Sequence, residues 1–379
     1  MSWPKVKLGD VAPAIPVKNV NLDEDELVWQ LNLDQIESNT GKIVDKVKQP
    51  LSSAGSSTHF FNNEHVLYSK LRPYLNKVVV PDELGIATTE LVPMKPDQKR
   101  LNKEYLAYYL RSKPFVEWVS TQVSGAKMPR VVMSIFWQHE MPLPPLYEQE
   151  RIVSVLDKSN RLRQKREQAI KLADDFLRAT FLEMFGDPIE NPKGWNVKPL
   201  ADQIVHANNG ISRRRKEDTN EGDIVLRLQD VHYSGIAFDK ELNRIKLVDK
   251  EKQIARVEHD DLLFIRVNGN PNYVGRTAVF KSYIEPVYHN DHLIRIKLDN
   301  EYQSDFLCYL INSPFSRKLI AQQIKTSAGQ HTISQDGILK LMFYRPPIEL
   351  QEKFINIKNK IESIFYRKDK HEELFASIS

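Results

Sequence analysis

The sequence contains very little cysteine and glycine. Cys308 is the single cysteine among 379 residues, and there are 14 glycines. One cysteine cannot form an intramolecular disulfide, and its apolar surroundings in FLCYLI predict a buried core thiol in a reducing, cytoplasmic setting. No glycine-rich turn of the G-x-G type is present, so the chain supplies no ordinary nucleotide-cofactor loop.

Long apolar runs and metal-binding patterns are also missing. The N-terminus MSWPKVKLGD has no signal-peptide core, and no apolar run approaches the length of a membrane span. The ten histidines show neither H-E-x-x-H nor another paired spacing, so a zinc site has no support. The net charge of +4 permits a polyanionic partner without demanding one. A chain of this length predicts two or three globular domains.

The sequence does contain a long-range repeat. Matching landmarks recur in the same order about two hundred residues apart, which favours an internal duplication over coincidence among common apolar patterns. The matched segments are WPKVKL at 3–8 with WNVKPL at 195–200, residues 66–80 with 262–280, Pro114–Phe115 with Pro314–Phe315, and Pro144–Pro145 with Pro346–Pro347.

Each half begins with a mixed segment and ends with a helix. Runs rich in Val, Ile, Tyr and Phe predict strands, most clearly KVVV, IVLRL, DLLFIRV, TAVF and HLIRIKL. The segment 102–122 and its echo predict helices interrupted at Ser-Lys-Pro and Asn-Ser-Pro. A helical segment follows each double proline, where proline stiffens the chain and fixes the helix start.

The first of these helices is predicted to run to Phe185, because no proline or glycine interrupts residues 148–185. At 1.5 Å per residue it is about 57 Å long. Apolar residues recur along it in adjoining stripes that include Leu156, Leu162, Ile170 and Leu177.

The C-terminal segment has a more regular seam, with spacings that alternate between three and four residues. Phe354, Ile357, Ile361, Ile364 and Phe375 are its apolar members. The two helices are therefore expected to pair as an antiparallel coiled coil between the mixed domains. The alternative is two ordinary amphipathic helices, each packed on its own domain.

This organisation resembles the specificity subunit of type I restriction-modification systems, over essentially the whole chain. The motifs that carry the resemblance are PLPPLYEQERIVSVLD at 142–157, FGDPIENPKGWNVKPL at 185–200, LYSKLRPYLNKV at 67–78 and NGNPNYVGR at 268–276. The second spacer, RPPIELQEKF, departs from the pattern because it lacks the Leu-Pro-Pro-Leu core and the Glu-Gln order.

The resemblance implies two duplicated α/β target recognition domains, at 1–145 and 187–345, separated by spacer helices at 146–186 and 346–379, with pseudo-two-fold symmetry. It implies a non-catalytic subunit whose domains each read one half of a bipartite site in double-stranded DNA. The spacers would set the gap and dock two methyltransferase subunits, which use S-adenosylmethionine; two motor-nuclease subunits, which use ATP and Mg²⁺, can join. No cofactor is expected on this chain.

Candidate DNA contacts are basic and amide side chains in loops rich in Gly, Pro and Ser, since phosphates and base edges need such donors. In the first half they are Lys70, Arg72, Tyr74, Lys77, Ser124, Lys127 and Arg130. In the second half they are Arg213, Arg214, Arg215, Lys216, Arg266, Asn268, Asn270, Arg276, Lys325, Gln330 and His331. The competing interpretation is solvated surface loops, with asparagines selected for turns.

Two other chemistries stay as alternatives. NPNY at 270–273 is similar to an adenine-methyltransferase motif, although a turn is the favoured interpretation. Asp82, Asp97 and Lys99 match a loose Mg²⁺-nuclease pattern, which would make the chain an enzyme. A third hypothesis is a scaffold that binds proteins through its helices and does not touch DNA.

Overall fold

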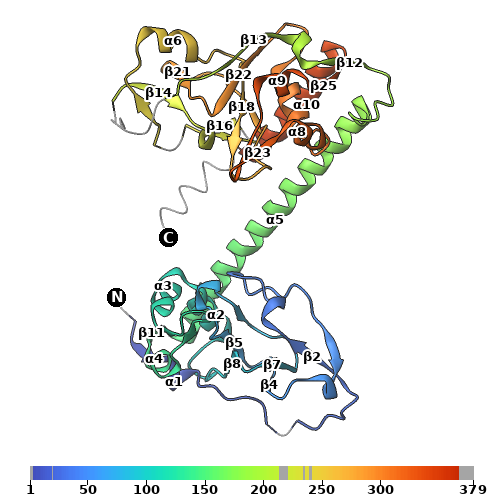
Figure 1. Ribbon diagram of the computed structural model, residues 1–379. Coiled ribbons are helices and arrows are strands. Elements are labelled where there is room, and N and C mark those ends of the chain that lie inside the picture. The colour runs from blue at the N-terminus through green and yellow to red at the C-terminus, as the bar shows by residue number, and fades with distance from the viewer. Residues whose placement is uncertain (1–2, 19, 213–220, 234, 239–240, 367–379) are drawn as a thin grey trace. The chain divides into compact units, whose positions relative to one another are not determined.

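The computed structural model describes residues 3–18, 20–212, 221–233, 235–238 and 241–366 (Figure 1). The chain divides into two compact units, residues 1–166 and 167–379. The helix α5 (Leu146–Phe185) contributes its first half to the first unit and its second half to the second.

The first unit combines small sheets with helices. Its four-stranded sheet has the order β3 (Lys48–Pro50), β2 (Leu27–Leu31), β7 (Gly85–Thr88), β4 (Thr58–Phe61), and its three-stranded sheet the order β6 (Val78–Val79), β5 (Val66–Ser69), β8 (Leu91–Met94). Two further pairs join β1 (Lys5–Lys7) to β11 (Glu140–Pro142) and β9 (Val123–Ser124) to β10 (Arg130–Val131). The helices are α1 (Leu8–Val11), α2 (Lys103–Arg111), α3 (Lys113–Thr121) and α4 (Met133–Gln138).

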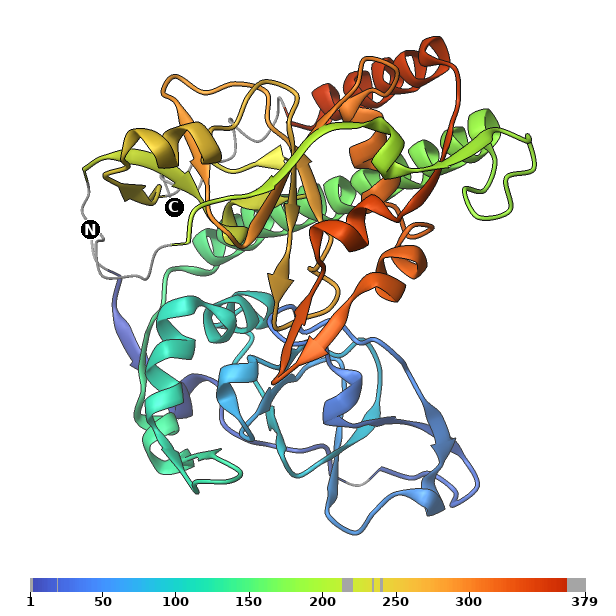
Figure 2. The same ribbon diagram turned by 45° about the horizontal axis from the view of Figure 1, so that its top comes forward.

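The second unit also combines small sheets with helices. Its four-stranded sheet has the order β13 (Ile204–Asn209), β22 (Leu293–Leu298), β18 (Leu262–Ile265), β20 (Thr277–Val279). Its two three-stranded sheets have the orders β17 (Arg244–Ile245), β14 (Asp223–Leu226), β21 (Val287–His289) and β19 (Val267–Asn268), β24 (Gln330–Thr332), β23 (Lys325–Ser327). Two further pairs join β12 (Asn196–Pro199) to β25 (Met342–Arg345) and β15 (Val231–His232) to β16 (Gly235–Ile236). The helices are α6 (Asp249–Ala255), α7 (Ser304–Asn312), α8 (Arg317–Gln323), α9 (Gln335–Leu339) and α10 (Ile348–Tyr366). Figures 1 and 2 show α6 at the opposite end of this unit from α8, α9 and α10.

The strands and helices expected from the sequence are confirmed. All five strand segments appear, in β6, β14, β18, β20 and β22. The helical segments break where Ser112 separates α2 from α3, and where Asn312 ends α7. The helices α5 and α10 both begin directly after the double prolines.

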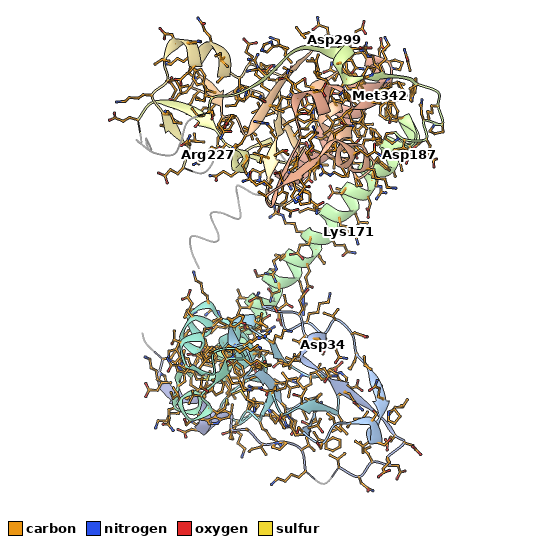
Figure 3. The ribbon with its side chains drawn as sticks, viewed as in Figure 1. Asp34, Lys171, Asp187, Arg227, Asp299 and Met342 are labelled. Carbon is orange, nitrogen blue, oxygen red and sulfur yellow. The ribbon has the colours of Figure 1, made fainter. Side chains whose placement is uncertain are left out.

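The segments matched in the sequence form matching strand pairs in the structure. The segment WPKVKL forms β1, which pairs antiparallel with β11 just before the first double proline. The segment WNVKPL forms β12, which pairs antiparallel with β25 just before the second double proline. Short 3₁₀ turns match as well: Asp34 marks the first, η1 (Leu33–Gln35), and Arg227 precedes the second, η5 (Leu228–Asp230), in Figure 3.

A buried glutamine near the start of each long helix repeats in the same way. The Gln149 amide oxygen accepts from the backbone N–H of Asn102 (2.8 Å), and the amide nitrogen donates to Arg100 O (2.8 Å) and Pro144 O (2.7 Å). Gln351 accepts from Gln303 N (2.9 Å) and donates to Glu301 O (3.4 Å) and Pro346 O (2.8 Å). Each glutamine therefore fixes its helix to the mixed domain that precedes it.

The helix ends pack on aromatic cores. Within the second unit, Phe181 and Phe185 of α5 lie edge-on to Phe354 of α10, with ring centroids 5.4 and 5.8 Å apart. Phe306 of α7 contacts all three rings and completes this cluster. The C-terminal end of α5 and the N-terminal turns of α10 thus share one core.

Candidate nucleic-acid interface

In the first unit, the structure brings together two predicted DNA-binding segments that are far apart in sequence. The backbone N–H of Arg72 donates to Pro129 O (2.8 Å), and that of Val131 donates to Lys70 O (2.9 Å). Leu71 and Arg130 form an antiparallel bridge between the segments. The loop after β5 and the β9–β10 hairpin therefore form one continuous surface.

The candidate side chains on this surface differ in how they are engaged. Lys77 donates its Nζ to Leu33 O (2.6 Å), and Arg130 forms an ion pair with Glu90 (2.9 Å), so both already have protein partners. Arg72 and Tyr74 are exposed, and Arg72 has a left-handed backbone conformation (φ 49°). Lys70 is half-buried, while Ser124 and Lys127 are exposed on the hairpin.

In the second unit, the equivalent segments form a three-stranded sheet. Asn268 of β19 pairs with His331 of β24, and β24 pairs with β23 in a hairpin, drawn in orange in Figure 2. The hairpin turns at Ala328 and Gly329, which both have positive φ (46° and 78°), as a two-residue type I′ turn requires. The expected loop 325–332 is thus an ordered hairpin joined to the segment that carries Arg266.

Several candidate residues of the second unit form hydrogen bonds within the turn that follows β19. Asn268 Oδ1 accepts from Asn270 N (2.9 Å), and Asn270 Oδ1 accepts from Asn272 N (3.0 Å), which are Asx turns. NPNY therefore forms a turn, as expected. Arg266 donates to Asp291 O (3.2 Å), and His331 Nδ1 lies 2.9 Å from Thr326 Oγ1. Lys325 and Gln330 are exposed.

Arg276 has an aromatic environment that the sequence did not reveal. Its guanidinium carbon lies 3.9 Å from the ring centroid of Tyr233 and 4.3 Å from that of Tyr273. Tyr233 comes from the β15–β16 hairpin, which follows Arg227 and η5 (Figure 3), far from Arg276 in sequence. No pattern in the sequence indicates this contact, because the two side chains meet only in the folded structure.

The basic cluster Arg213, Arg214, Arg215 and Lys216 lies outside the residues that the structure describes, as does Phe375 of the C-terminal seam. These predictions therefore remain as they were made from the sequence.

The helix residues predicted to bind partners fall into two groups. Phe354 and Leu177 are buried, and Ile357 and Ile361 are half-buried. The remaining members and several neighbours on α5 are exposed: Val155, Leu156, Leu162, Ile170, Leu172, Phe176 and Ile364. An amphipathic surface of this kind is typical of a helix that binds another molecule or helix.

A groove of about 1060 Å³ lies within the second unit. Its walls come from the second half of α5, from α7 and from α10, and β20 and the β15–β16 hairpin also line it. Carboxylates (Asp174, Asp175, Asp305, Glu362) and cations (Arg178, Arg276, Lys281, Lys358) both face it. Cys308, expected to be buried, is half-buried on this wall, and burial raises the pKa of its thiol to about 12.

The geometry gives the enzyme hypothesis no support. Asp82 forms an ion pair with Lys46 (2.7 Å), and Asp97 Oδ1 accepts from its neighbour Lys99 N (3.1 Å) in an Asx turn. Across the described part of the chain, no group of three or more His, Cys, Asp or Glu residues could bind a metal ion. Within the same residues, no helix is long and apolar enough to cross a membrane.

Comparison with known proteins assigns this architecture to a class. The family model for the type I restriction modification DNA specificity domain matches residues 2–172. The StySPI specificity subunit of Salmonella potsdam is 30% identical over 280 residues, which are 71% of this chain and 59% of that protein. The EcoKI specificity subunit of Escherichia coli K12 is 22% identical over 71% of this chain and 60% of its own length. The chain spans about three fifths of these relatives.

Solved structures agree on the fold. The S subunit of a type I restriction-modification system from M. genitalium superimposes with a TM-score of 0.61 at 16% identity, covering 100% of this chain and 94% of that one. A chain from a type I R-M system superimposes with a TM-score of 0.55 at 18% identity, covering 100% and 95%. The chain belongs to the family of type I restriction-modification specificity subunits.

Proposed function

We propose that the chain reads a bipartite site in double-stranded DNA, one half-site for each unit. The main support is that each unit joins the same two polar segments into one surface: the loop after β5 or β18, and the hairpin after α3 or α8. These surfaces offer exposed donors, including Arg72, Lys127 and Lys325, suited to phosphates and base edges. The units differ in side chains, so they read different half-sites.

The proposed domain limits follow the repeat: recognition domains at 1–145 and 187–345, and spacers at 146–186 and 346–379. We assign the exposed apolar stripe of α5 and the seam of α10 to an antiparallel coiled coil and to the docking of two methyltransferase subunits. This arrangement has pseudo-two-fold symmetry, and its spacers set the distance between the half-sites. In DNA-binding proteins with two-fold symmetry, that distance is about one helical turn of DNA or a multiple of it.

Chemistry belongs to the partners in this proposal. The methyltransferase subunits bind S-adenosylmethionine and methylate adenine, and two nuclease subunits with ATP and Mg²⁺ can join in the cytoplasm. This chain contributes recognition and geometry, and needs no cofactor of its own.

The test is methylation mapping. The chain is co-expressed with its methyltransferase subunit in an unmethylated host, and modified adenines are mapped across the genome. A split motif with a fixed gap is expected, and exchanging residues 1–145 should alter one half-site only. If the complex co-purifies but methylates nothing, the recognition assignment is refuted, and a scaffold that does not touch DNA becomes the better explanation.

A further inference from the structure

The guanidinium of Arg276 contacts two exposed aromatic rings. Tyr233 and Tyr273 are 53% and 43% exposed, and both rings contact the guanidinium at cation–π distances. Such contacts are attractive at each ring face. Together they restrict the guanidinium plane, which is otherwise mobile on a long side chain, and leave its edge as the part that can donate hydrogen bonds.

This guanidinium has no hydrogen-bond acceptor among the residues that the structure describes. Among the described residues, none accepts a hydrogen bond from it or forms an ion pair with it, and its Nε is buried without a partner. Arg244 in the same unit is different, because Glu285 accepts from its Nη1 (2.9 Å) and Nη2 (2.6 Å). Guanidinium donors normally find acceptors, so those of Arg276 are available to an acceptor on another molecule.

The turn that carries Tyr273 and Arg276 is fixed to the helix α8. Arg317 donates to Val274 O (3.0 Å) and to Pro271 O (3.1 Å). Burial lowers the pKa of Arg317, and the neighbouring charge of Arg276 lowers it further, so two cations lie close together here. A rigid support and concentrated positive charge both suit a ligand with exposed acceptor atoms.

Space for such a ligand exists beside the stack. Tyr233 and Arg276 both line the groove of about 1060 Å³ in the second unit, so the guanidinium borders open space rather than packed protein. The turn that carries Tyr273 and Arg276 directly follows β19 in the sequence. The strand β19 pairs with β24, and both belong to the proposed DNA-reading surface.

We propose that Arg276, clamped by Tyr233 and Tyr273, is a specificity-determining residue that reads a guanine in the half-site of the second unit. This inference rests on the proposed function. A guanidinium held in plane presents two parallel N–H donors, and guanine presents O6 and N7 as a matching pair of acceptors in the major groove. A phosphate needs only a cation and would not require the aromatic clamp.

Among the described residues of the first unit, no arginine contacts two aromatic rings in this way. Lys77 occupies the position of Arg276, because its carbonyl accepts from Ser69 N (3.0 Å) as that of Arg276 accepts from Ile265 N (2.8 Å). The Lys77 ammonium is already bonded to Leu33 O. The guanine preference should therefore be confined to one half-site.

The test compares Arg276→Lys with Arg244→Lys, a matched control at an arginine whose carboxylate partner is known. Each full-length variant is co-expressed with the methyltransferase subunit, and methylated motifs are mapped as above. For Arg276→Lys, one guanine position in one half-site should become degenerate, with a loss of discrimination of roughly 5- to 150-fold, while the other half-site and the gap stay unchanged. Arg244→Lys should give the wild-type motif.

The outcomes separate the inference from the function on which it rests. A wild-type chain without a bipartite motif overturns both. A wild-type motif that Arg276→Lys leaves unchanged overturns the guanine assignment alone. If Arg276→Lys abolishes methylation, the purified complex is titrated with site DNA and with DNA changed at each guanine. An equal loss of affinity for all DNAs indicates a phosphate contact and refutes the assignment.

A second pair of variants tests the clamp. Tyr273→Phe keeps the aromatic face and should retain the wild-type motif, because the attraction depends on the ring and not on its hydroxyl. Tyr273→Ala frees the guanidinium and should relax the same guanine position that Arg276→Lys relaxes. Relaxation at a different position by Tyr273→Ala would mean that the tyrosine contacts DNA independently, and would contradict the clamp.

Discussion

Replacing either buried glutamine with leucine should loosen the attachment of a long helix to its own unit. Gln149 and Gln351 are fully buried, and each makes three hydrogen bonds with the main chain. Leucine is similar in volume but offers no polar atom. Gln149→Leu therefore leaves the Asn102 N–H and the carbonyls of Arg100 and Pro144 without their partner.

The size of the effect follows from these bonds. A typical net contribution of about 1 kcal/mol for each hydrogen bond gives about 3 kcal/mol for the three, and more where water cannot replace the lost partner. Because tenfold in an equilibrium constant corresponds to about 1.4 kcal/mol, the opening of this region should become roughly a hundredfold more frequent. Gln351→Leu should cost somewhat less, since its bond to Glu301 O is long at 3.4 Å.

Native-state hydrogen exchange measures this effect in each unit separately. Gln149→Leu should accelerate exchange of the Asn102 amide by about two decades without changing that of Gln303, and Gln351→Leu should do the reverse. Glu150→Leu, at an exposed neighbouring position of α5, is the control and should change neither amide. Unchanged protection of Asn102 in Gln149→Leu would show that the bonds contribute nothing and would refute the reasoning.

Three further predictions concern stability. Burial lowers the pKa of His289 to about 4. Below about pH 6.5 the unfolded chain therefore binds a proton that the folded chain excludes. The free energy of unfolding of the second unit should fall by about 2 kcal/mol between pH 7 and pH 5. His289→Asn should flatten this dependence in thermal unfolding. Phe354→Ala, in the aromatic core, should cost about 3–5 kcal/mol in urea denaturation, whereas Ile364→Ala, 61% exposed, should cost under about 0.5. Gly41→Ala should destabilise the chain by more than about 2 kcal/mol, because φ is +69° and the new Cβ would lie 1.9 Å from Val78 O; Gly55→Ala, with open space around it, should be neutral.

Much of the architecture could be predicted because its signals are local. The double prolines, the absence of helix breakers up to Phe185 and the Ser-Lys-Pro interruption all act within a few residues, and each boundary was found. The duplication was visible because local signals repeat in order. The coiled-coil pairing is not a local prediction, because it depends on contacts between two helices that are far apart in the sequence.

The glutamines show what local patterns miss. A polar residue at Gln149 or Gln351 is indistinguishable from a surface residue until its partners, some fifty positions earlier, are placed beside it. The candidate DNA surface has the same limitation. Its loops were recognised by composition, but their convergence, the engagement of Lys77 by Leu33, and the contribution of Tyr233 all depend on tertiary contacts.

The proposed function requires one main-chain frame to serve two specificities. Bonds made by the main chain repeat between the two units: Lys70 O accepts from Val131 N, as Arg266 O accepts from Ile333 N. Main-chain bonds require no particular side chain at those positions. The side chains at equivalent positions can therefore differ, as those of Lys77 and Arg276 do, while the main-chain bonds stay the same. Under the proposed function, recognition is set by side chains that the main-chain bonds position, so exchanging those side chains should alter the sequence that is read before it alters the fold.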